Sequence, residues 1–559
     1  MKQQLTLEQE LENYIDNEDK IIAIPYSLMR VKSELSLLER TTEVGEWSRI
    51  YVCAQYVSTE FFEVILRDYF KMGKTESEFL TNSLQSYSGS VDELLVNELK
   101  SLLEENRMLR VGLSRGPRGG LKFDSNTFVS NLLQIATIRN KGGRLLIYNK
   151  SKGIYEELTF TIVGKITKYL LNRAVAGSWK STYEKDINEG IIRSIVEISA
   201  EDVGLQLVCT ANGILNLETR QFFAHSTEYL LTTQIPVQYD AAAICPKFKK
   251  FISEITCNDE ELANVIQEAV GNTLISNTKA NKAIFFFGCG ANGKSVLADI
   301  MNRLLGKSNV TSTPLSAFGK QFGIETIIDK MANISGENEV SGKLGTELLK
   351  GIISGDVIEV QRKYKTSITY RPTCKLFFLV NTLPDTSDDT DGYYRKIQLI
   401  PFNRVFKVEE QNVNLKEELL EELPGILNWA LEGAYRLIDN NYRFTDSVAV
   451  SNLHKNYKAN QNPVQEFYKS MLVFEEGSKI YKSDILSAYK AWLDANGISG
   501  GETISSQKFW KLLDNAAKSI HGRELVYLQN QGYYRLQDYN IAMNDVCTNQ
   551  INTSFEFIA

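Results

Sequence analysis

Residues 283–301 read AIFFFGCGANGKSVLADIM, which is the pattern of a buried strand, a glycine-rich loop and a helix. The loop, residues 288–295, matches GxxxxGK[ST], the pattern of a phosphate-binding loop. Its glycines allow backbone N–H groups to turn inward around phosphates, and a helix expected to begin near Ser295 would add partial positive charge beneath them. The alternative is a glycine-rich turn that binds nothing. The complete motif in this context favours a nucleotide site in an α/β core.

The side chains of this loop predict ATP and Mg²⁺ as ligands. Lys294 is expected to reach the β- and γ-phosphates, and the hydroxyl of Ser295 is expected to ligate Mg²⁺. The nucleotide-contacting set expected from the motif is Gly288, Gly290, Ala291, Asn292, Gly293, Lys294, Ser295 and Val296.

Composition excludes several classes of protein. The chain has 559 residues, of which 43% are hydrophobic and 23% charged, as in an ordinary globular protein of several domains. No apolar run approaches the ~18 residues of a membrane span, and residues 1–8 do not resemble a signal peptide. We therefore expect a cytoplasmic protein with no membrane partner. The seven cysteines form no CxxC pair, so a structural zinc site is not expected. The net charge of −7 excludes a generally basic surface but allows a local basic patch.

Two further apolar segments end in polar residues suited to nucleotide hydrolysis. Residues 331–335 predict a strand that leads to Glu337, which could coordinate Mg²⁺ or polarise water. Residues 376–380 predict a second strand followed by Asn381, whose amide could orient water against the γ-phosphate. The alternative for Glu337 is an exposed loop carboxylate.

Arg395 precedes the apolar residues 397–402 and follows an acidic loop at 385–391. Such an arginine could stabilise the transition state from a neighbouring subunit, which can contribute ~10³–10⁵ in rate. A surface arginine paired with the acidic loop is the alternative. The catalytic candidates are thus Lys294, Glu337, Asn381 and Arg395.

The chain is expected to be a multidomain α/β protein. The glycine-rich residues 112–122 indicate a linker, in which Arg115, Arg118 and Lys122 could touch a nucleic-acid backbone but a solvated linker is favoured. The expected divisions are a mainly helical region of unknown role at 1–122, a mixed domain at 123–270, the α/β core at 271–446, a winged helix at 447–545 and a flexible tail at 546–559.

These motifs together resemble the superfamily III helicases, and most closely the helicase part of phage and plasmid primase-helicases and their poxvirus relatives. The resemblance covers about residues 123–540. It depends on the phosphate loop, the acid-tipped strand, KGIISGD at 350–356, the Asn-tipped strand and Arg395 before Ile400-Pro401-Phe402. Upstream, NGILNL at 212–217 and CPKF at 245–248 resemble the domain that precedes the motor in that family.

The resemblance implies an AAA+ motor that hydrolyses ATP, assembles as a hexameric ring and moves 3′ to 5′ on single-stranded DNA. Lys294, Ser295, Glu337, Asn381 and Arg395 match the family's site positions. Many relatives carry two adjacent arginines where this chain has Tyr394 and Arg395, which leaves open whether Lys396 shares the role. The implied partners are single-stranded and forked DNA, copies of this chain, origin DNA and replication proteins of a phage, plasmid or mobile element in a bacterial host cell.

Residues 357–370 predict two β-rich runs around a basic and aromatic tip. In the family the matching hairpin projects into the pore of the ring, so Arg362, Lys363 and Lys365 are the expected DNA contacts. Cations track phosphates without reading sequence, and an aromatic ring can stack on a base for ~1–3 kcal/mol. A solvated hairpin tip is the alternative.

Other functions fit the sequence less well. The nucleotide site of archaeo-eukaryotic primases uses a histidine, and no histidine precedes His225, so residues 1–122 are not expected to be such a primase. A P-loop kinase or transferase is disfavoured because no separate acceptor-binding module is evident. An ATP-switched origin-binding initiator without processive unwinding stays open. In the winged helix, the segment from Ser505 would serve as recognition helix and residues 529–532 as the wing.

Overall fold

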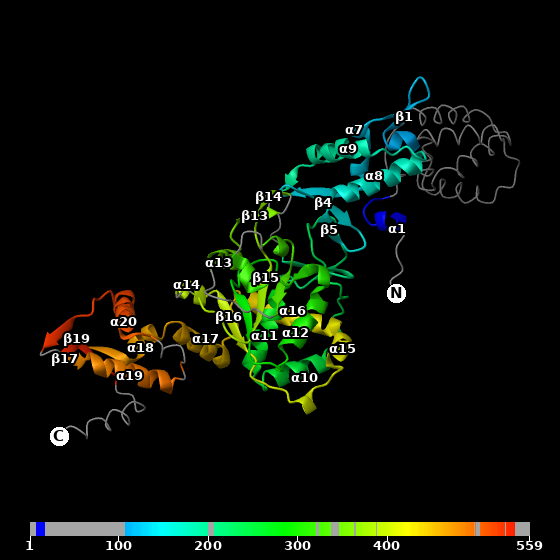
Figure 1. The fold of residues 1–559 in the computed structure, drawn as a ribbon. Helices are drawn as coiled ribbons and strands as arrows, with labels where there is room; N and C mark the ends of the chain where they lie inside the picture. Colours follow the sequence, from blue (N-terminus) through cyan, green and yellow to red (C-terminus); the bar gives the residue numbers. More distant parts are fainter. Residues whose placement is uncertain are drawn as a thin grey trace, which may run out of the picture. The chain divides into compact units, whose positions relative to one another are not determined.

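The computed structural model divides the chain into two compact units (Figure 1). It describes residues 7–16, 107–198, 206–319, 324–336, 346–362, 365–386, 388, 390–496, 498, 504–530 and 533–542. The first unit comprises Met1–Gly204 and His225–Thr232, and the second comprises Leu205–Ala224 and Thr233–Ala559. The helices expected within residues 17–106 and the tail at 546–559 lie outside the described residues. The domain boundaries expected after residues 122, 270 and 446 stay predictions.

The first unit packs helices against a small sheet. Its described elements are α1 (Leu7–Leu11), β1 (Leu113–Arg115), β2 (Leu121–Phe123), α7 (Ser125–Ile135), β3 (Ile138–Lys141), β4 (Arg144–Asn149), β5 (Ile154–Glu157), α8 (Phe160–Ala174), α9 (Ser181–Ser194) and β6 (Glu197–Ile198). The strand order is β5-β4-β3-β6. Its core joins Leu11 and Leu113 to Phe128 of α7 and Ile166 of α8.

The glycine-rich residues 112–122 are not a linker. β1 and β2 pair as an antiparallel hairpin, with Leu113 opposite Phe123 and Arg115 opposite Leu121. Residues on both sides of the hairpin, such as Met108 and Phe128, lie in one core. The local signal of glycine and proline was the same as in a linker, and only the packing on either side distinguishes the two.

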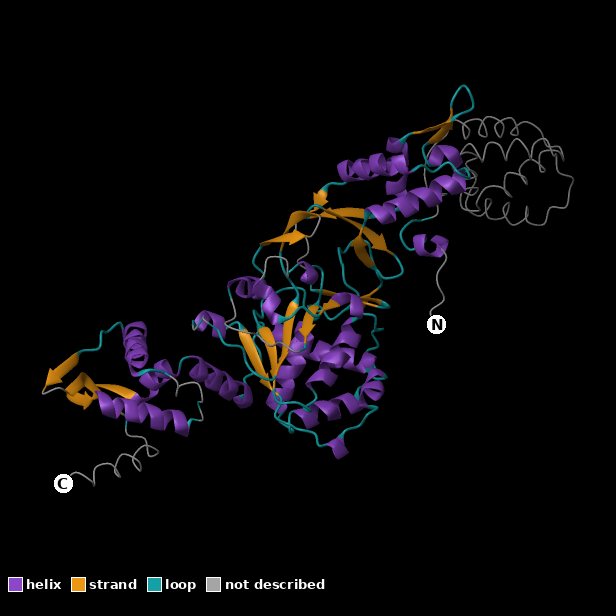
Figure 2. Cartoon of the chain, in the orientation of Figure 1, coloured by secondary structure: helices purple, strands orange, loops and turns teal. Residues whose placement is uncertain are grey.

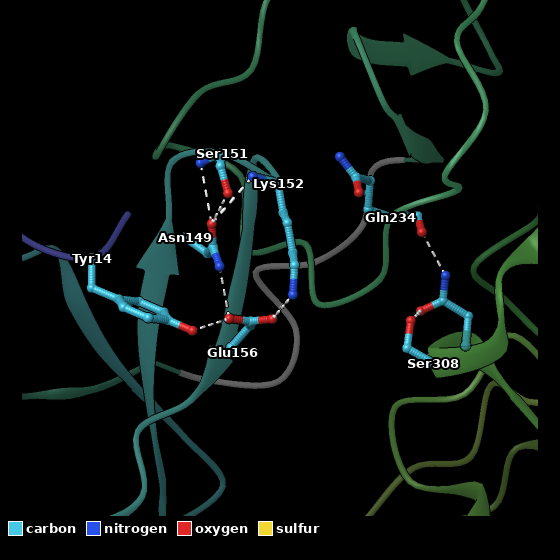
Figure 3. A network of polar contacts seen from close by, with 8 residues as sticks. Tyr14, Asn149, Ser151, Lys152, Glu156, Gln234 and Ser308 are labelled. Atoms are coloured by element: carbon cyan, nitrogen blue, oxygen red, sulfur yellow. Dashed lines mark hydrogen bonds and ion pairs between the residues drawn. The ribbon is translucent and has the colours of Figure 1, made fainter. Parts of the chain in front are cut away.

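A polar network holds the described N-terminal residues to the β4–β5 hairpin (Figure 3). The Tyr14 hydroxyl donates to Glu156 Oε2 at 2.6 Å, and Lys152 Nζ donates to Glu156 Oε1 at 2.6 Å. Asn149 Nδ2 donates to the same carboxylate at 2.9 Å. Burial alone would raise the pKa of Glu156, but these three hydrogen bonds outweigh it and lower that pKa.

The second unit is built on a parallel sheet with helices on its faces (Figure 2). The strands are β10 (Ala283–Phe287), β11 (Val310–Thr311), β12 (Ala332–Ser335), β15 (Lys375–Val380) and β16 (Ile397–Pro401). Their spatial order is β11-β12-β15-β10-β16, and each neighbouring pair is parallel. After β10 the chain forms β11 at one edge of the sheet and then β12 and β15, each nearer to β10. It then passes to the other side of β10 and forms β16. The order therefore reverses at β10, and ligands of such sheets bind at the carboxyl ends of the strands around this point.

Alternate residues of β10 enter two different cores. Ile284 and Phe286 pack with α10 (Pro246–Ile255), α11 (Glu260–Asn272), α12 (Lys294–Leu305), α15 (Leu415–Leu420) and α16 (Leu423–Asp439). Ala283 and Phe285 pack on the other face with α13 (Glu347–Ser354) and with Tyr457 of α17 (Val448–Gln461). A strand buried on both faces explains the continuous apolar run that the sequence shows.

Smaller sheets complete the second unit. β7 (Leu207–Thr210), β8 (Gly213–Asn216) and β9 (Phe222–Phe223) form one antiparallel sheet, and β13 (Ile358–Arg362) pairs with β14 (Lys365–Tyr370) in a hairpin. The short helix α14 (Asp391–Tyr394) lies directly before β16.

The C-terminal part has the order helix, strand, two helices and a hairpin. Its elements are α18 (Pro463–Met471), β17 (Leu472–Tyr481), α19 (Lys482–Ala495), α20 (Ser506–His521), β18 (Tyr527–Asn530) and β19 (Tyr533–Ile541). The sequence predicts helices at about residues 483–495 and 505–519 and strands at 524–527 and 533–536. Both helices and the second strand are present, whereas β18 begins three residues after the start of the first predicted strand and β17 was not predicted. Of the residues predicted for the core, Phe509 and Leu513 are buried and Trp510 is partly buried. None of the described helices combines the length and the apolar character needed to cross a lipid bilayer.

Candidate nucleotide site

The loop between β10 and α12 has a backbone that requires its glycines. A Cβ on Gly288 would lie 2.5 Å from both Asn292 Nδ2 and the Phe402 carbonyl oxygen. Gly293 has φ +87°, and a Cβ there would lie 2.7 Å from Ile255 Cγ2. A Cβ on Gly290 would meet nothing within 4 Å, so open space adjoins the loop at that point. The loop is therefore tight against the protein on one side and open on the other.

Lys294 is a buried cation that has no acidic partner in the part of the chain that the structure describes. Only 6% of the residue is exposed. Its Nζ donates to the Gly288 carbonyl at 2.5 Å and to Asn381 Oδ1 at 3.3 Å. Among the residues that the structure describes, Lys294 takes part in no ion pair, and burial lowers the pKa of its ammonium group. An anion beside Lys294 would satisfy this charge, so the residues present fit a phosphate group.

Lys294 and Asn381 meet because their strands are neighbours. β10 and β15 run parallel in register, with Phe287 opposite Val380, so both polar residues follow carboxyl ends at the same sheet edge. The Gly288 N–H donates to the Val380 carbonyl at 3.3 Å, which joins the two strand ends. The sequence placed these residues on separate strands. Their contact depends on the strand order.

A cleft of about 1970 Å³ opens over this edge. Ser295, Val296 and Asn381 line it, together with Gly336 after β12. Glu337, the predicted acid, lies outside the described residues, although its neighbour Gly336 reaches the cleft. Ser295 is exposed, as a metal-ligating hydroxyl would have to be.

One wall of the cleft was not foreseen from the sequence. It comprises residues of α10 and of the segment that follows β16, namely Lys247, Lys250, Phe251, Glu254, Phe406, Glu410, Gln411, Asn412, Leu415 and Glu418. The Phe406 N–H donates to the Ala291 carbonyl at 2.9 Å, which holds that segment against the loop. No local signal in the sequence connected either segment to residues 288–295.

Arg395 lies at the opposite edge of the sheet from its own phosphate loop. β16 is parallel to β10, with Ala283 opposite Ile397 and Phe287 opposite Pro401. Arg395 precedes β16, whereas the loop follows β10. Four strand steps of ~3.3 Å each separate the two ends by at least about 13 Å. Arg395 is exposed and donates from Nε to the Asp391 carbonyl at 3.3 Å, and it does not line the cleft.

Lys396, in contrast, is bound within its own chain. Its Nζ donates to Asn281 Oδ1 at 3.1 Å, to the Lys350 carbonyl at 3.4 Å and to the Ser354 hydroxyl. Only Arg395 of this pair extends an exposed side chain.

The segment before Arg395 is fastened to α13. Asp388 accepts from Lys350 Nζ and from Thr346 Oγ1, both at 2.6 Å. Burial acts to raise the pKa of Asp388, but these hydrogen bonds prevail and hold it well below its usual range. Because α13 leads within a few residues into the β13–β14 hairpin, the Arg395 segment and that hairpin are connected through one helix.

The hairpin expected at 357–370 is present. Val360 pairs with Ile368 and both are buried against the α13 face of the sheet. Arg362 pairs with Lys365 at the tip, although their side chains lie outside what the structure describes. Lys363 itself lies outside the described residues. The base of the hairpin is thus anchored in the core, and its DNA contacts stay a prediction.

Comparison with protein families gives two matches. The model described as "D5 N terminal like" matches residues 146–257. The model described as "Family of unknown function (DUF5906)" matches residues 286–396, a range that contains Lys294, Asn381 and Arg395.

Curated relatives include two large viral proteins. "Putative helicase 184R" of Invertebrate iridescent virus 6 is 23% identical, over 57% of this chain and 37% of the viral protein. "Putative helicase L207/L206" of Acanthamoeba polyphaga mimivirus is 24% identical, over 43% of this chain and 27% of the viral protein. The matches thus span 37% and 27% of the length of these two relatives. Both relatives are named putative helicases, and the D5 match lies within residues 146–257 of this chain.

Among solved structures, the apo form of the C-terminal region of NrS-1 is similar to this chain at a TM-score of 0.43 and 12% identity. The alignment covers 72% of this chain and 96% of that one.

Proposed function

We propose that this chain is an ATP-driven DNA helicase of the AAA+ superfamily III type, with hydrolysis at the Lys294 loop. One observation carries the proposal. Lys294 is a buried cation without an ion pair among the described residues; it lies beside Asn381 at the point where the strand order reverses, while Arg395 lies at the far edge. A second copy of the chain could therefore bring Arg395 to the phosphates. The viral relatives that carry the name helicase support the same activity.

The chemistry follows from the position of each group. Lys294 would draw negative charge from the β- and γ-phosphates of ATP, and Asn381 would orient the attacking water in line with the leaving ADP. Ser295 and Glu337 would hold Mg²⁺, which neutralises charge on the phosphate oxygens when bound. Glu337 would also polarise the water. The unforeseen wall around Phe251 and Phe406 would receive the nucleoside.

The distance between Arg395 and its own loop supports assembly of several copies. If each Arg395 serves the loop of the next copy, the interface is head-to-tail, and such an interface forms a ring where the rotation between copies closes. We propose a hexamer that moves 3′ to 5′ along a single strand. The β13–β14 hairpin of each copy would face the strand, and α13 would transmit the position of the Arg395 segment to it.

The C-terminal part supports contact with duplex DNA. Its order of helix, strand, two helices and hairpin is that of a winged helix, in which α20 would enter a groove. A winged helix also suits the second candidate, an ATP-switched initiator that marks an origin without processive unwinding.

Strand displacement separates the two candidates. The purified full chain is incubated with ATP, Mg²⁺ and duplexes that carry a single-stranded tail of either polarity, and its particles are viewed by electron microscopy. We expect rings and release of the labelled strand only from the duplex whose tail allows 3′-to-5′ movement. ATP hydrolysis and DNA binding without strand release would favour the initiator.

Removing both lysines of the β13–β14 tip should uncouple hydrolysis from DNA. The variant with Lys363→Ala and Lys365→Ala is expected to keep its basal ATPase rate, because neither lysine belongs to the proposed hydrolytic set. Its stimulation by single strands should fall to background, since phosphate contacts supply most of non-specific affinity. ATPase rates with and without a single-stranded oligonucleotide test this. Normal stimulation in the variant would show that the tip does not hold DNA.

A further inference from the structure

The β1–β2 hairpin, residues 113–123, is an ordered projection of the first unit. Its strands pair from Leu113 opposite Phe123 to Arg115 opposite Leu121. The turn is closed by the Gly116 N–H, which donates to the Gly120 carbonyl at 2.8 Å, and by the Gly119 N–H, which donates to the Gly116 carbonyl at 2.9 Å. In Figure 1 this turn extends away from α7, α8 and α9.

The base of the hairpin is locked into the unit. Leu113 is 1% exposed, and the ring of Phe123 stacks on Tyr183 with centroids 4.3 Å apart. The Asp124 N–H donates to the Gly112 carbonyl at 2.8 Å, and Asp124 Oδ1 caps α7 by accepting from the Asn126 N–H at 3.0 Å. A two-stranded hairpin is marginal by itself, so this fixed base is what presents the tip in one orientation.

The projecting part is basic and carries no acid. Arg115, Arg118 and Lys122 are exposed, and the sequence has no Asp or Glu from residue 106 to residue 123. Within the described part of the chain, no ion pair involves any of these three cations. A Cβ on Gly119 or Gly120 would meet nothing within 4 Å, so the turn is open to a large partner.

The cations lie on both faces of the ribbon. Cross-strand partners share a face and successive residues alternate, so Lys122 shares a face with Ser114, and Arg115 lies on the other face with Leu121. Arg118 is at the turn between them. A ribbon two strands wide fits the major groove of B-DNA, and cations on its two faces would then oppose the phosphate chains on the two sides of that groove. A glycine-rich turn offers few side chains that could read bases.

We infer that the β1–β2 hairpin binds duplex DNA through its phosphates, without sequence preference, at a site separate from the β13–β14 hairpin. The inference rests on the proposed function, because it is the proposed helicase activity that identifies DNA as the polyanion bound by this hairpin. Its turn lacks the large apolar side chains with which peripheral proteins enter a lipid surface, which favours DNA over a membrane.

Binding to a labelled duplex at several salt concentrations tests this with the full chain. The test variant carries Arg115→Gln, Arg118→Gln and Lys122→Gln. The control variant carries Lys180→Gln, Lys185→Gln and Arg193→Gln, which remove the same charge from exposed positions at α9 in the same unit. Each phosphate contact makes the negative slope of log K against log salt steeper by about 0.9. The slope of the test variant should therefore be shallower than that of the wild type by about 2 to 3, and its affinity for the duplex should be about tenfold lower or more. The control should match the wild type.

Three results would overturn the inference: an unchanged slope in the test variant, an equal loss in the control, or a loss confined to single-stranded DNA. If the wild type binds anionic vesicles and the test variant does not, while both bind the duplex equally, the hairpin binds a membrane and not DNA. Basal ATPase is measured on the same samples and should be unchanged in both variants. A wild type that binds the duplex through the hairpin yet hydrolyses no ATP would contradict the proposed function and leave this inference standing.

Discussion

Lys294→Ala is expected to lower ATP turnover by about 10³-fold or more, because under the proposed mechanism it removes the cation that would stabilise charge on the transferred phosphate in a buried site. The fold should persist. Within the part of the chain that the structure describes, the Lys294 ammonium group makes two hydrogen bonds, to Gly288 and Asn381, and its desolvation opposes folding. Steady-state phosphate release measures the turnover, and circular dichroism checks the fold.

Lys282→Met provides the matched control. Lys282 is a partly buried lysine that directly precedes the strand that the loop follows, and desolvation lowers its pKa to about 8. Its Nζ contacts only the Ile397 carbonyl among the bonds described, at 3.3 Å. Turnover by Lys282→Met should be near that of the wild type. If the Lys282 variant lost as much turnover as the Lys294 variant, the effect of Lys294 would be one of general stability.

Arg395→Ala is expected to lower turnover by about 10³-fold or more while nucleotide affinity changes by less than about threefold. The reason is geometric, since Arg395 lies beyond the far end of β16 from its own loop. It could stabilise the transition state only in a neighbouring copy, and it would add little to ground-state binding. Titration with a fluorescent ATP analogue measures affinity separately from turnover.

Mixing variants tests the action between subunits directly. Neither Lys294→Ala nor Arg395→Ala has a complete site by itself. A mixed assembly contains some interfaces where an intact loop meets an intact arginine, so turnover should reappear on mixing. If variants that demonstrably form mixed assemblies recover no turnover, the site is not shared between two copies.

Lys396→Ala should lower the thermal stability of the protein more than its ATP turnover, because that lysine donates hydrogen bonds to Asn281, Lys350 and Ser354 of its own chain.

The strand, glycine-rich loop and helix at residues 283–301 could be predicted from sequence because the signal is local. Within 19 residues, an apolar run, a glycine pattern and a helix start specify a strand, a loop and a helix. The same holds for the hairpin at 357–370 and for the helices at 482–495 and 506–521. Local signals failed at residues 112–122, where a linker and a hairpin share the same glycine and proline content.

The sequence by itself therefore determined which groups are present: a glycine-rich loop that contains Lys294, a strand ending before Asn381, and an arginine before the last strand of the parallel sheet. Only the tertiary structure decided which of them meet. Asn381 adjoins Lys294 because β15 pairs with β10, and Arg395 is excluded from the same site because β16 runs parallel to β10 from the opposite edge. The pattern of apolar residues along a chain indicates which faces of each strand are buried. It does not record which strand lies beside which, since that depends on contacts between residues about a hundred positions apart.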